Sequence, residues 1–142
     1  MPKIAEFIKL HSPDQKPVLI CQWVQRCYEE GRTVAVHVAS AGEAAALDKQ
    51  LWTFSDQTFI PHVLASKAQE PVIEPVTICC GDEPAGQADV LIEAAGGAPA
   101  DRFRQFDRVF DFAEVFDDAL REQSRARYKA CQEAGYKMRF IE

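Results

Sequence analysis

The sequence predicts a single α/β domain built around a largely parallel central sheet flanked by helices. Short apolar runs alternate with longer segments of helical periodicity, a rhythm that is typical of strand–helix–strand units. The chain has 142 residues, of which 47% are hydrophobic and 27% charged. That is enough for one compact domain, residues 1–142, with a core of its own.

The first strand and the first helix are predicted within residues 5–30. Residues 5–10 form a short apolar run, and the turn at residues 11–14 can cap the helix that follows. Pro17 is tolerated in the first helical turn, where a missing N–H is no loss. Gly31 is expected to end the helix. The apolar residues of this helix recur at three- and four-residue spacing, as on one face: Leu19, Ile20, Trp23, Val24 and Cys27.

A second strand and helix follow. Residues 33–38 are rich in β-branched side chains and predict a buried strand. From Gly42 the composition changes to good helix formers, so a second helix is expected to end near Trp52. A polar loop at residues 66–74 then separates this helix from a third long strand at residues 75–80.

The remaining sequence predicts two strands and a last helix. A turn at residues 81–84 leads to strands at residues 90–94 and 108–112. The last helix is predicted at about residues 115–135, with acidic residues near its positive N-terminal end. Four alanines share one side of this helix and are expected to pack against the sheet: Ala119, Ala126, Ala130 and Ala134.

Charge and cysteine content restrict the function class. A net charge of −6 and a pI near 5.1 argue against a surface that binds a phosphate backbone throughout, because that role needs a basic face. No apolar run reaches the roughly 20 residues of a membrane span, and the N-terminus lacks a signal-peptide pattern. We therefore expect a cytoplasmic protein. Five cysteines without CxxC spacing predict free thiols that fill the core: Cys21, Cys27, Cys79, Cys80 and Cys131.

No catalytic, metal or cofactor motif accompanies this pattern. The glycine-rich turn that nucleotide-binding domains place after the first strand is absent, and Gly96-Gly97 lacks the lysine of a phosphate loop. His11, His37 and His62 do not have the spacing of a helical metal site. We expect His37, which lies in an apolar strand, to be a hydrogen-bonded core or edge histidine.

The last helix carries a basic stripe in an otherwise acidic chain. At roughly 100° per residue, Arg121, Arg125 and Lys129 align, and Tyr128 lies beside them. Cationic side chains bind carboxylates, and the ring offers an apolar surface, so the stripe fits an acidic peptide with an aromatic end. Compensation of the helix dipole on a solvated face accounts for the same spacing. Arg127 lies outside the stripe, and the sequence predicts no role for it.

An aromatic corner, residues 51–62, follows the second helix. Trp52, Phe54 and Phe59 stand among polar residues where that helix should end. Rings at such a corner are either buried in their own domain or used to bind another protein, since aromatic anchors carry much of the energy of small interfaces.

The two features together resemble the chi subunit of bacterial DNA polymerase III, over essentially the whole chain. The residues that carry the resemblance are Leu47-Asp48, Leu51-Trp52, Phe59-Ile60-Pro61-His62, Arg125-Ala126-Arg127-Tyr128-Lys129-Ala130 and Ala134-Gly135-Tyr136. The resemblance implies a Rossmann-like fold without nucleotide chemistry. It also implies a noncatalytic adapter in the clamp-loader assembly, with no cofactor, no metal and no strong direct binding of nucleic acid or membrane.

Two protein partners are implied by the same resemblance. One is the psi subunit of DNA polymerase III, bound through Trp52, Phe59, Ile60, Pro61 and His62. The other is the acidic, Phe-ending C-terminal tail of the single-stranded-DNA-binding protein, bound through Arg121, Arg125, Tyr128 and Lys129.

Two other function classes stay open from the residues alone. An α/β fold permits a small nucleotide-binding or enzymatic domain. Direct binding of single-stranded nucleic acid would use Tyr128 to stack on a base beside the cations, although the acidic charge of the chain disfavours it.

Overall fold

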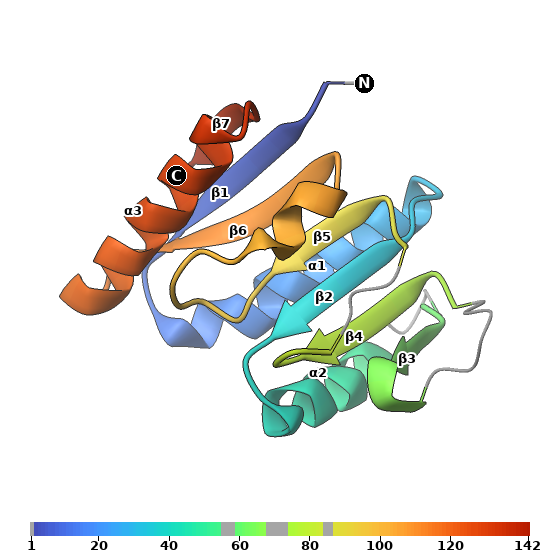
Figure 1. Cartoon of the computed structure of the whole chain (residues 1–142). Helices are drawn as coiled ribbons and strands as arrows, with labels where there is room; N and C mark the ends of the chain where they lie inside the picture. Colours follow the sequence, from blue (N-terminus) through green and yellow to red (C-terminus); the bar gives the residue numbers. More distant parts are fainter. Residues whose placement is uncertain (1, 55–58, 68–73, 84–86) are drawn as a thin grey trace.

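A parallel sheet of seven strands forms the centre of the molecule. The computed structural model describes residues 2–54, 59–67, 74–83 and 87–142. The strands are β1 (Ile4–Leu10), β2 (Val34–Val38), β3 (His62–Leu64), β4 (Val76–Cys80), β5 (Val90–Glu93), β6 (Arg108–Glu114) and β7 (Lys137–Ile141). Their order is β3-β4-β2-β5-β6-β1-β7, and each neighbouring pair is parallel (Figure 1). The predicted α/β, Rossmann-like fold is confirmed.

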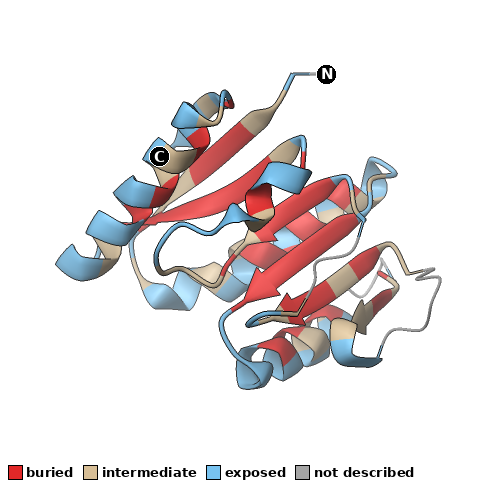
Figure 2. Ribbon diagram, viewed as in Figure 1, coloured by how far each residue is buried: buried red, intermediate tan, exposed pale blue. Residues whose placement is uncertain are grey.

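Helices cover both faces of the sheet. They are α1 (Lys16–Glu29), α2 (Ala41–Thr53), α3 (Asp118–Glu133) and a short 3-10 helix, η3 (Asp101–Gln105). α1 and α2 lie on one face, whereas α3 and η3 lie on the other (Figure 1). The side chains beneath α1 and α2 form one apolar cluster, which includes Trp23 and Phe112. Those beneath α3 and η3 form a second cluster, which includes Phe7 and Phe106. Figure 2 shows that the buried residues concentrate in the strands between these layers.

Local hydrogen bonds explain where the helices begin and end. Ser40 precedes α2, and its hydroxyl oxygen accepts the backbone N–H of Glu43 at 3.2 Å. Asp117 caps α3 in the same way by accepting the N–H of Leu120 at 3.0 Å. Gly31 follows α1 with φ of 75°, a backbone conformation that favours glycine, as expected for a residue that ends a helix.

Two edge strands have no counterpart in the sequence prediction. β3 begins at His62, the last residue of the aromatic corner, and has only three residues. β7 follows the last helix, and four of its five residues are exposed. β3 is too short to give a recognisable apolar run, and in β7 the charged residues Lys137 and Arg139 interrupt the apolar ones, as is common in edge strands.

The prediction that four alanines turn α3 toward the sheet is wrong for Ala119 and Ala126, which are exposed. The buried residues of α3 are Ser124, Arg127 and Cys131. Arg127 takes an inner position because carboxylates on the sheet pair with it there. Ala130 and Ala134 do pack against the second apolar cluster, as predicted, so the buried face of α3 combines this apolar packing with the charge pairing of Arg127.

The five cysteines are free, as predicted, and all but Cys80 are buried. Burial raises the pKa of Cys21 to about 11, so its thiol stays protonated and acts as core filler.

Three predicted segments lie partly outside the described residues: the aromatic corner at 55–58, the loop at 68–73 and the turn at its last residue, 84. Among the helices that are described, none combines the length and the apolar character that a membrane crossing requires.

Candidate protein-binding surfaces

The basic stripe of α3 opens onto a groove between this helix and the edge of the sheet. The groove has a volume of about 890 Å³, in the range of pockets that hold drug-sized ligands. The four predicted tail-binding residues all line it: Arg121, Arg125, Tyr128 and Lys129. Strand and loop residues far away in the sequence complete its walls, among them Phe7, Lys9, His11, Val115 and Phe140. The structure therefore brings the predicted residues together in one concave site.

Arg125 and Lys129 are exposed, and among the described residues only neighbours on their own helix form ion pairs with them. Arg125 Nη1 lies 3.0 Å from Glu122 Oε1, and Lys129 Nζ lies 3.9 Å from Glu133 Oε1. Exposed pairs of this kind contribute about 0–1 kcal/mol. A carboxylate ligand can therefore take the place of either glutamate at little cost in free energy.

Arg121 and two aromatic rings form the better-anchored part of the groove. Arg121 Nη2 donates to the Val115 carbonyl at 2.7 Å, which ties this cation to the end of β6. The Tyr128 ring packs edge-on against Phe7, with 5.2 Å between the ring centroids. Phe140 on β7 is 49% exposed and leaves apolar surface open. An apolar floor beside cations is a combination that binds an aromatic residue next to carboxylates.

Arg127, for which the sequence predicts no role, fastens α3 to the sheet. Its Nε donates to Asp111 Oδ2 at 3.0 Å, and its Nη1 donates to the Gly97 carbonyl at 2.7 Å. Because Arg127 lies between Arg125 and Tyr128 in the sequence, these bonds also determine where the groove residues lie.

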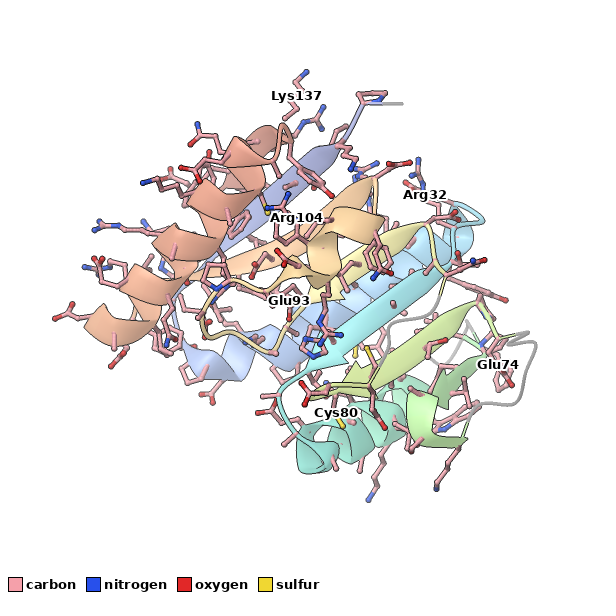
Figure 3. All side chains as sticks on the ribbon, viewed as in Figure 1. Arg32, Glu74, Cys80, Glu93, Arg104 and Lys137 are labelled. Carbon is pink, nitrogen blue, oxygen red and sulfur yellow. The ribbon has the colours of Figure 1, made fainter. Side chains whose placement is uncertain are left out.

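Buried charged groups gather at the carboxyl ends of the central strands. His37 Nδ1 lies 2.6 Å from Glu93 Oε1, and His37 Nε2 lies 2.8 Å from the Gly81 carbonyl oxygen. The predicted hydrogen-bonded core histidine is confirmed. Figure 3 labels Glu93, which lies near the middle of the sheet.

Burial acts on the pKa of both acid and base in this region. Burial alone would lower the pKa of His37, but the hydrogen bond and charge of Glu93 and the Gly81 carbonyl outweigh it and raise that pKa. Burial raises the pKa of Asp111 to about 7, against the lowering effect of Arg127. Among the described residues, no group of three or more His, Cys, Asp or Glu side chains is arranged to hold a metal ion.

Trp52 and Phe59 form an exposed aromatic patch beside β3. Their side chains are 48% and 68% exposed, and their ring centroids lie 5.2 Å apart. Pro61 is partly exposed, whereas Phe54 packs in part against the core beneath α2. Large rings left this open on a small domain mark a binding surface for another protein.

The other two predicted residues of the corner, Ile60 and His62, lie beneath this patch. They are 2% and 5% exposed. The His62 ring contacts the Trp52 ring, with 4.1 Å between centroids. Its Nδ1 lies 2.8 Å from the Ile60 carbonyl oxygen, and its Nε2 lies 3.3 Å from Asp48 Oδ1. His62 therefore positions Trp52, while Trp52 and Phe59 present the surface.

Comparison with known proteins identifies the family. Residues 1–139 match the family model described as DNA polymerase III chi subunit, HolC. The chain belongs to the DNA polymerase III chi subunit family.

Three relatives named DNA polymerase III subunit chi give the extent of the similarity. The Pseudomonas aeruginosa protein is 30% identical over 128 residues, which cover 87% of this chain and 84% of the relative. The Haemophilus influenzae protein is 30% identical over 122 residues, covering 84% and 82%. The Escherichia coli protein is 29% identical over 121 residues, covering 84% and 80%. The resemblance noted in the sequence is confirmed.

In this chi-family protein the two candidate surfaces lie at opposite edges of the sheet. The aromatic patch flanks β3, and the groove flanks β7. These two strands are the first and the last in the sheet order (Figure 1). Adjacent strands are about 4.8 Å apart, so the two edges are separated by roughly 30 Å. The two surfaces therefore do not overlap.

The sequence prediction missed the groove residues that come from β1 and β7. Phe7, Lys9 and His11 alternate along β1 and its end, which places them on the face that α3 covers. That alternation is a usable signal once the position of α3 is known. Phe140 gives no such signal, because it belongs to an exposed edge strand.

Proposed function

We propose that this chi-family protein is a noncatalytic adapter of the DNA polymerase III holoenzyme, acting in the cytoplasm. It links the clamp loader, through the psi subunit, to the acidic C-terminal tail of the single-stranded-DNA-binding protein. Membership of the family rests on the match over residues 1–139. The assignment of the partners is supported by the chemistry of the two surfaces.

The groove beside α3 gives the proposal its main support. Its cations, Arg121, Arg125 and Lys129, surround an aromatic floor in a chain whose net charge is −6. An acidic chain repels a nucleic-acid backbone as a whole, so a local basic groove favours a short acidic peptide. A terminal aromatic ring would pack on Tyr128 and Phe140, and the carboxylates would pair with the cations.

The aromatic patch supports the second half of the proposal. Trp52 and Phe59 expose apolar surface that a partner would remove from water, at roughly 25 cal/mol per Å². We assign this patch to the psi subunit. Ile60 and His62 contribute by supporting the two rings, because both are buried in the chi-family domain itself.

Titration with an acidic peptide that ends in phenylalanine tests the groove assignment. Arg125→Ala should weaken binding about tenfold, because a hydrogen bond to a charged group contributes about 1.5–3 kcal/mol. Arg104→Ala is the matched control. Arg104 is an exposed arginine on η3 that does not line the groove, and like Arg125 it pairs with a carboxylate three residues earlier. If Arg125→Ala binds the peptide as tightly as the parent chain, the groove is not the tail site.

A further inference from the structure

β7 is an edge strand whose outer backbone groups are open. Within the described chain it pairs with β1 only. The Lys137 N–H donates to the Lys3 carbonyl at 2.7 Å, so the backbone groups of Lys137 and of the alternate residue Arg139 face β1. The N–H and C=O groups of Met138 and Phe140 therefore point away from the sheet. An edge of this kind can pair with an added strand.

This open edge runs directly into the groove beside α3. Phe140 belongs to β7 and lines the groove, opposite Tyr128 and Lys129 of α3. With about 890 Å³, the groove has room for more than a single aromatic ring. A peptide whose aromatic end lies in the groove therefore has its preceding residues next to β7.

The charge along β7 sets the direction of such a peptide. Lys137 and Arg139 are exposed in the first half of the strand, whereas Glu142 lines the groove at the other end. Figure 3 labels Lys137, which lies close to the start of β1. Acidic residues are attracted toward the Lys137 end. A peptide with its C-terminal ring in the groove then runs in the same direction as β7.

The pairing of Arg139 leaves positive charge for a ligand. Its Nη1 lies 3.5 Å from Glu6 Oε1, but the same oxygen lies 3.2 Å from Arg108 Nη2. Among the described side chains, one carboxylate thus serves two guanidinium groups, which leaves one positive charge without a carboxylate of its own. The cations of β7 also disfavour a second copy of this chain at the edge, because like charges would meet.

We propose that the acidic segment preceding the aromatic end of the tail adds to β7 as an eighth, parallel strand. This inference rests on the proposed function of the groove and extends it: the side chains of the tail end bind in the groove, and the tail backbone hydrogen-bonds to Met138 and Phe140. The affinity of the tail peptide then depends on its length and on every second one of its backbone amides, in addition to its charge and its terminal ring.

Peptides of two lengths test the strand addition on the full chain. A long acidic peptide that spans β7 and ends in phenylalanine should bind about tenfold more tightly than a short peptide holding only its last few residues. N-methylation of single amides in the long peptide should weaken binding at alternate positions only. That two-residue period follows from the geometry of a strand.

A matched pair of chain variants tests the same backbone contact from the other side. Both variants remove the methionine side chain. Met138→Pro also removes the outward N–H, a loss that an edge strand tolerates, whereas Met138→Ala keeps that N–H. The long peptide should bind Met138→Pro about fivefold more weakly than Met138→Ala, whereas the short peptide should not distinguish the two variants.

The possible outcomes separate the inference from the proposed function. Equal affinity of the long and short peptides overturns the strand addition but leaves the groove assignment in place. A longer peptide that binds more tightly without any effect of N-methylation also overturns it, because charge alone would then explain the gain. If neither peptide binds, the groove assignment fails, and the inference fails with it. The N-methylated peptides decide the question even if Met138→Pro does not fold.

Discussion

Arg127 Nε on α3 lies 3.0 Å from Asp111 Oδ2 on β6, and both side chains are buried. This ion pair joins the helix that carries the basic groove to the centre of the sheet. Burial alone would lower the pKa of Arg127, but Asp111 and Glu114 outweigh it and raise that pKa, which keeps the guanidinium charged. The position of the groove therefore depends on a residue that does not itself line the groove.

Removing Arg127 should destabilise the fold strongly. Arg127→Ala leaves Asp111 and Glu114 buried without their cation, so the free energy of unfolding should fall by about 3–5 kcal/mol. Arg125→Ala is the control on the same helix, and the exposed position of Arg125 should limit its effect to about 0.5 kcal/mol. Urea denaturation of both variants checks this. Equal stability of the two would mean that the buried pair does not hold α3.

The stability of the chain should depend on pH through His37. The pKa of His37 is raised from 6.5 in the folded state by Glu93, so its contribution is complete below the unfolded pKa and is lost as pH rises through the folded pKa. The stability difference between the parent and His37→Asn should therefore shrink as pH rises from about 6 into the alkaline range. Thermal unfolding at several pH values measures it. A stability difference between the two chains that grows with pH would contradict a raised pKa of His37 in the folded state.

Freeing Arg125 from its helix neighbour should strengthen binding of the acidic peptide. Glu122→Gln removes the carboxylate that lies 3.0 Å from Arg125 Nη1, and it also removes a charge that repels the ligand. We expect affinity to rise about two- to threefold at low salt and less at high salt. Glu30→Gln, which alters an exposed glutamate paired with Arg32, is the control. Titration at two salt concentrations checks the effect, and weaker binding by Glu122→Gln would count against the groove.

Substitutions at the neighbouring residues Phe59 and Ile60 should have different effects, one on binding to psi and the other on stability. Phe59→Ala removes a ring that is 68% exposed, so it should weaken association with the psi subunit by about 2 kcal/mol without changing unfolding. Ile60→Ala empties a buried site and should lower the free energy of unfolding by about 2–5 kcal/mol. Pull-down with psi and denaturation of each variant give both values. A Phe59→Ala chain that binds psi normally would remove the aromatic patch from the proposal.

The interior strands and the three α-helices could be predicted from the sequence because the spacing of their apolar side chains follows burial directly, whereas the short η3 is not predicted. Val34 to Val38 is buried throughout, and the apolar face of α1 has the spacing of a helix packed on a sheet. β3 and β7 could not be predicted in this way. β3 has only three residues, and in the exposed β7 charged residues alternate with apolar ones.

Some residues of the candidate sites could be predicted from the sequence, and others could not. The stripe on α3 follows from helical geometry, so Arg121, Arg125 and Lys129 could be grouped without a structure. Arg127 could not be placed, because an arginine is buried only where carboxylates from distant strands meet it. The same limit applies to His62, whose partner Asp48 lies on α2.

In the proposed function, this chain has two independent protein-binding surfaces at opposite edges of its sheet. The most direct test is the affinity of the acidic, Phe-ending peptide for the free chain and for the chain already bound to psi. We expect the same dissociation constant in both states, with Arg125→Ala weakening only peptide binding and Phe59→Ala only psi binding. Displacement of the peptide by psi, or loss of both partners in either variant, would contradict it.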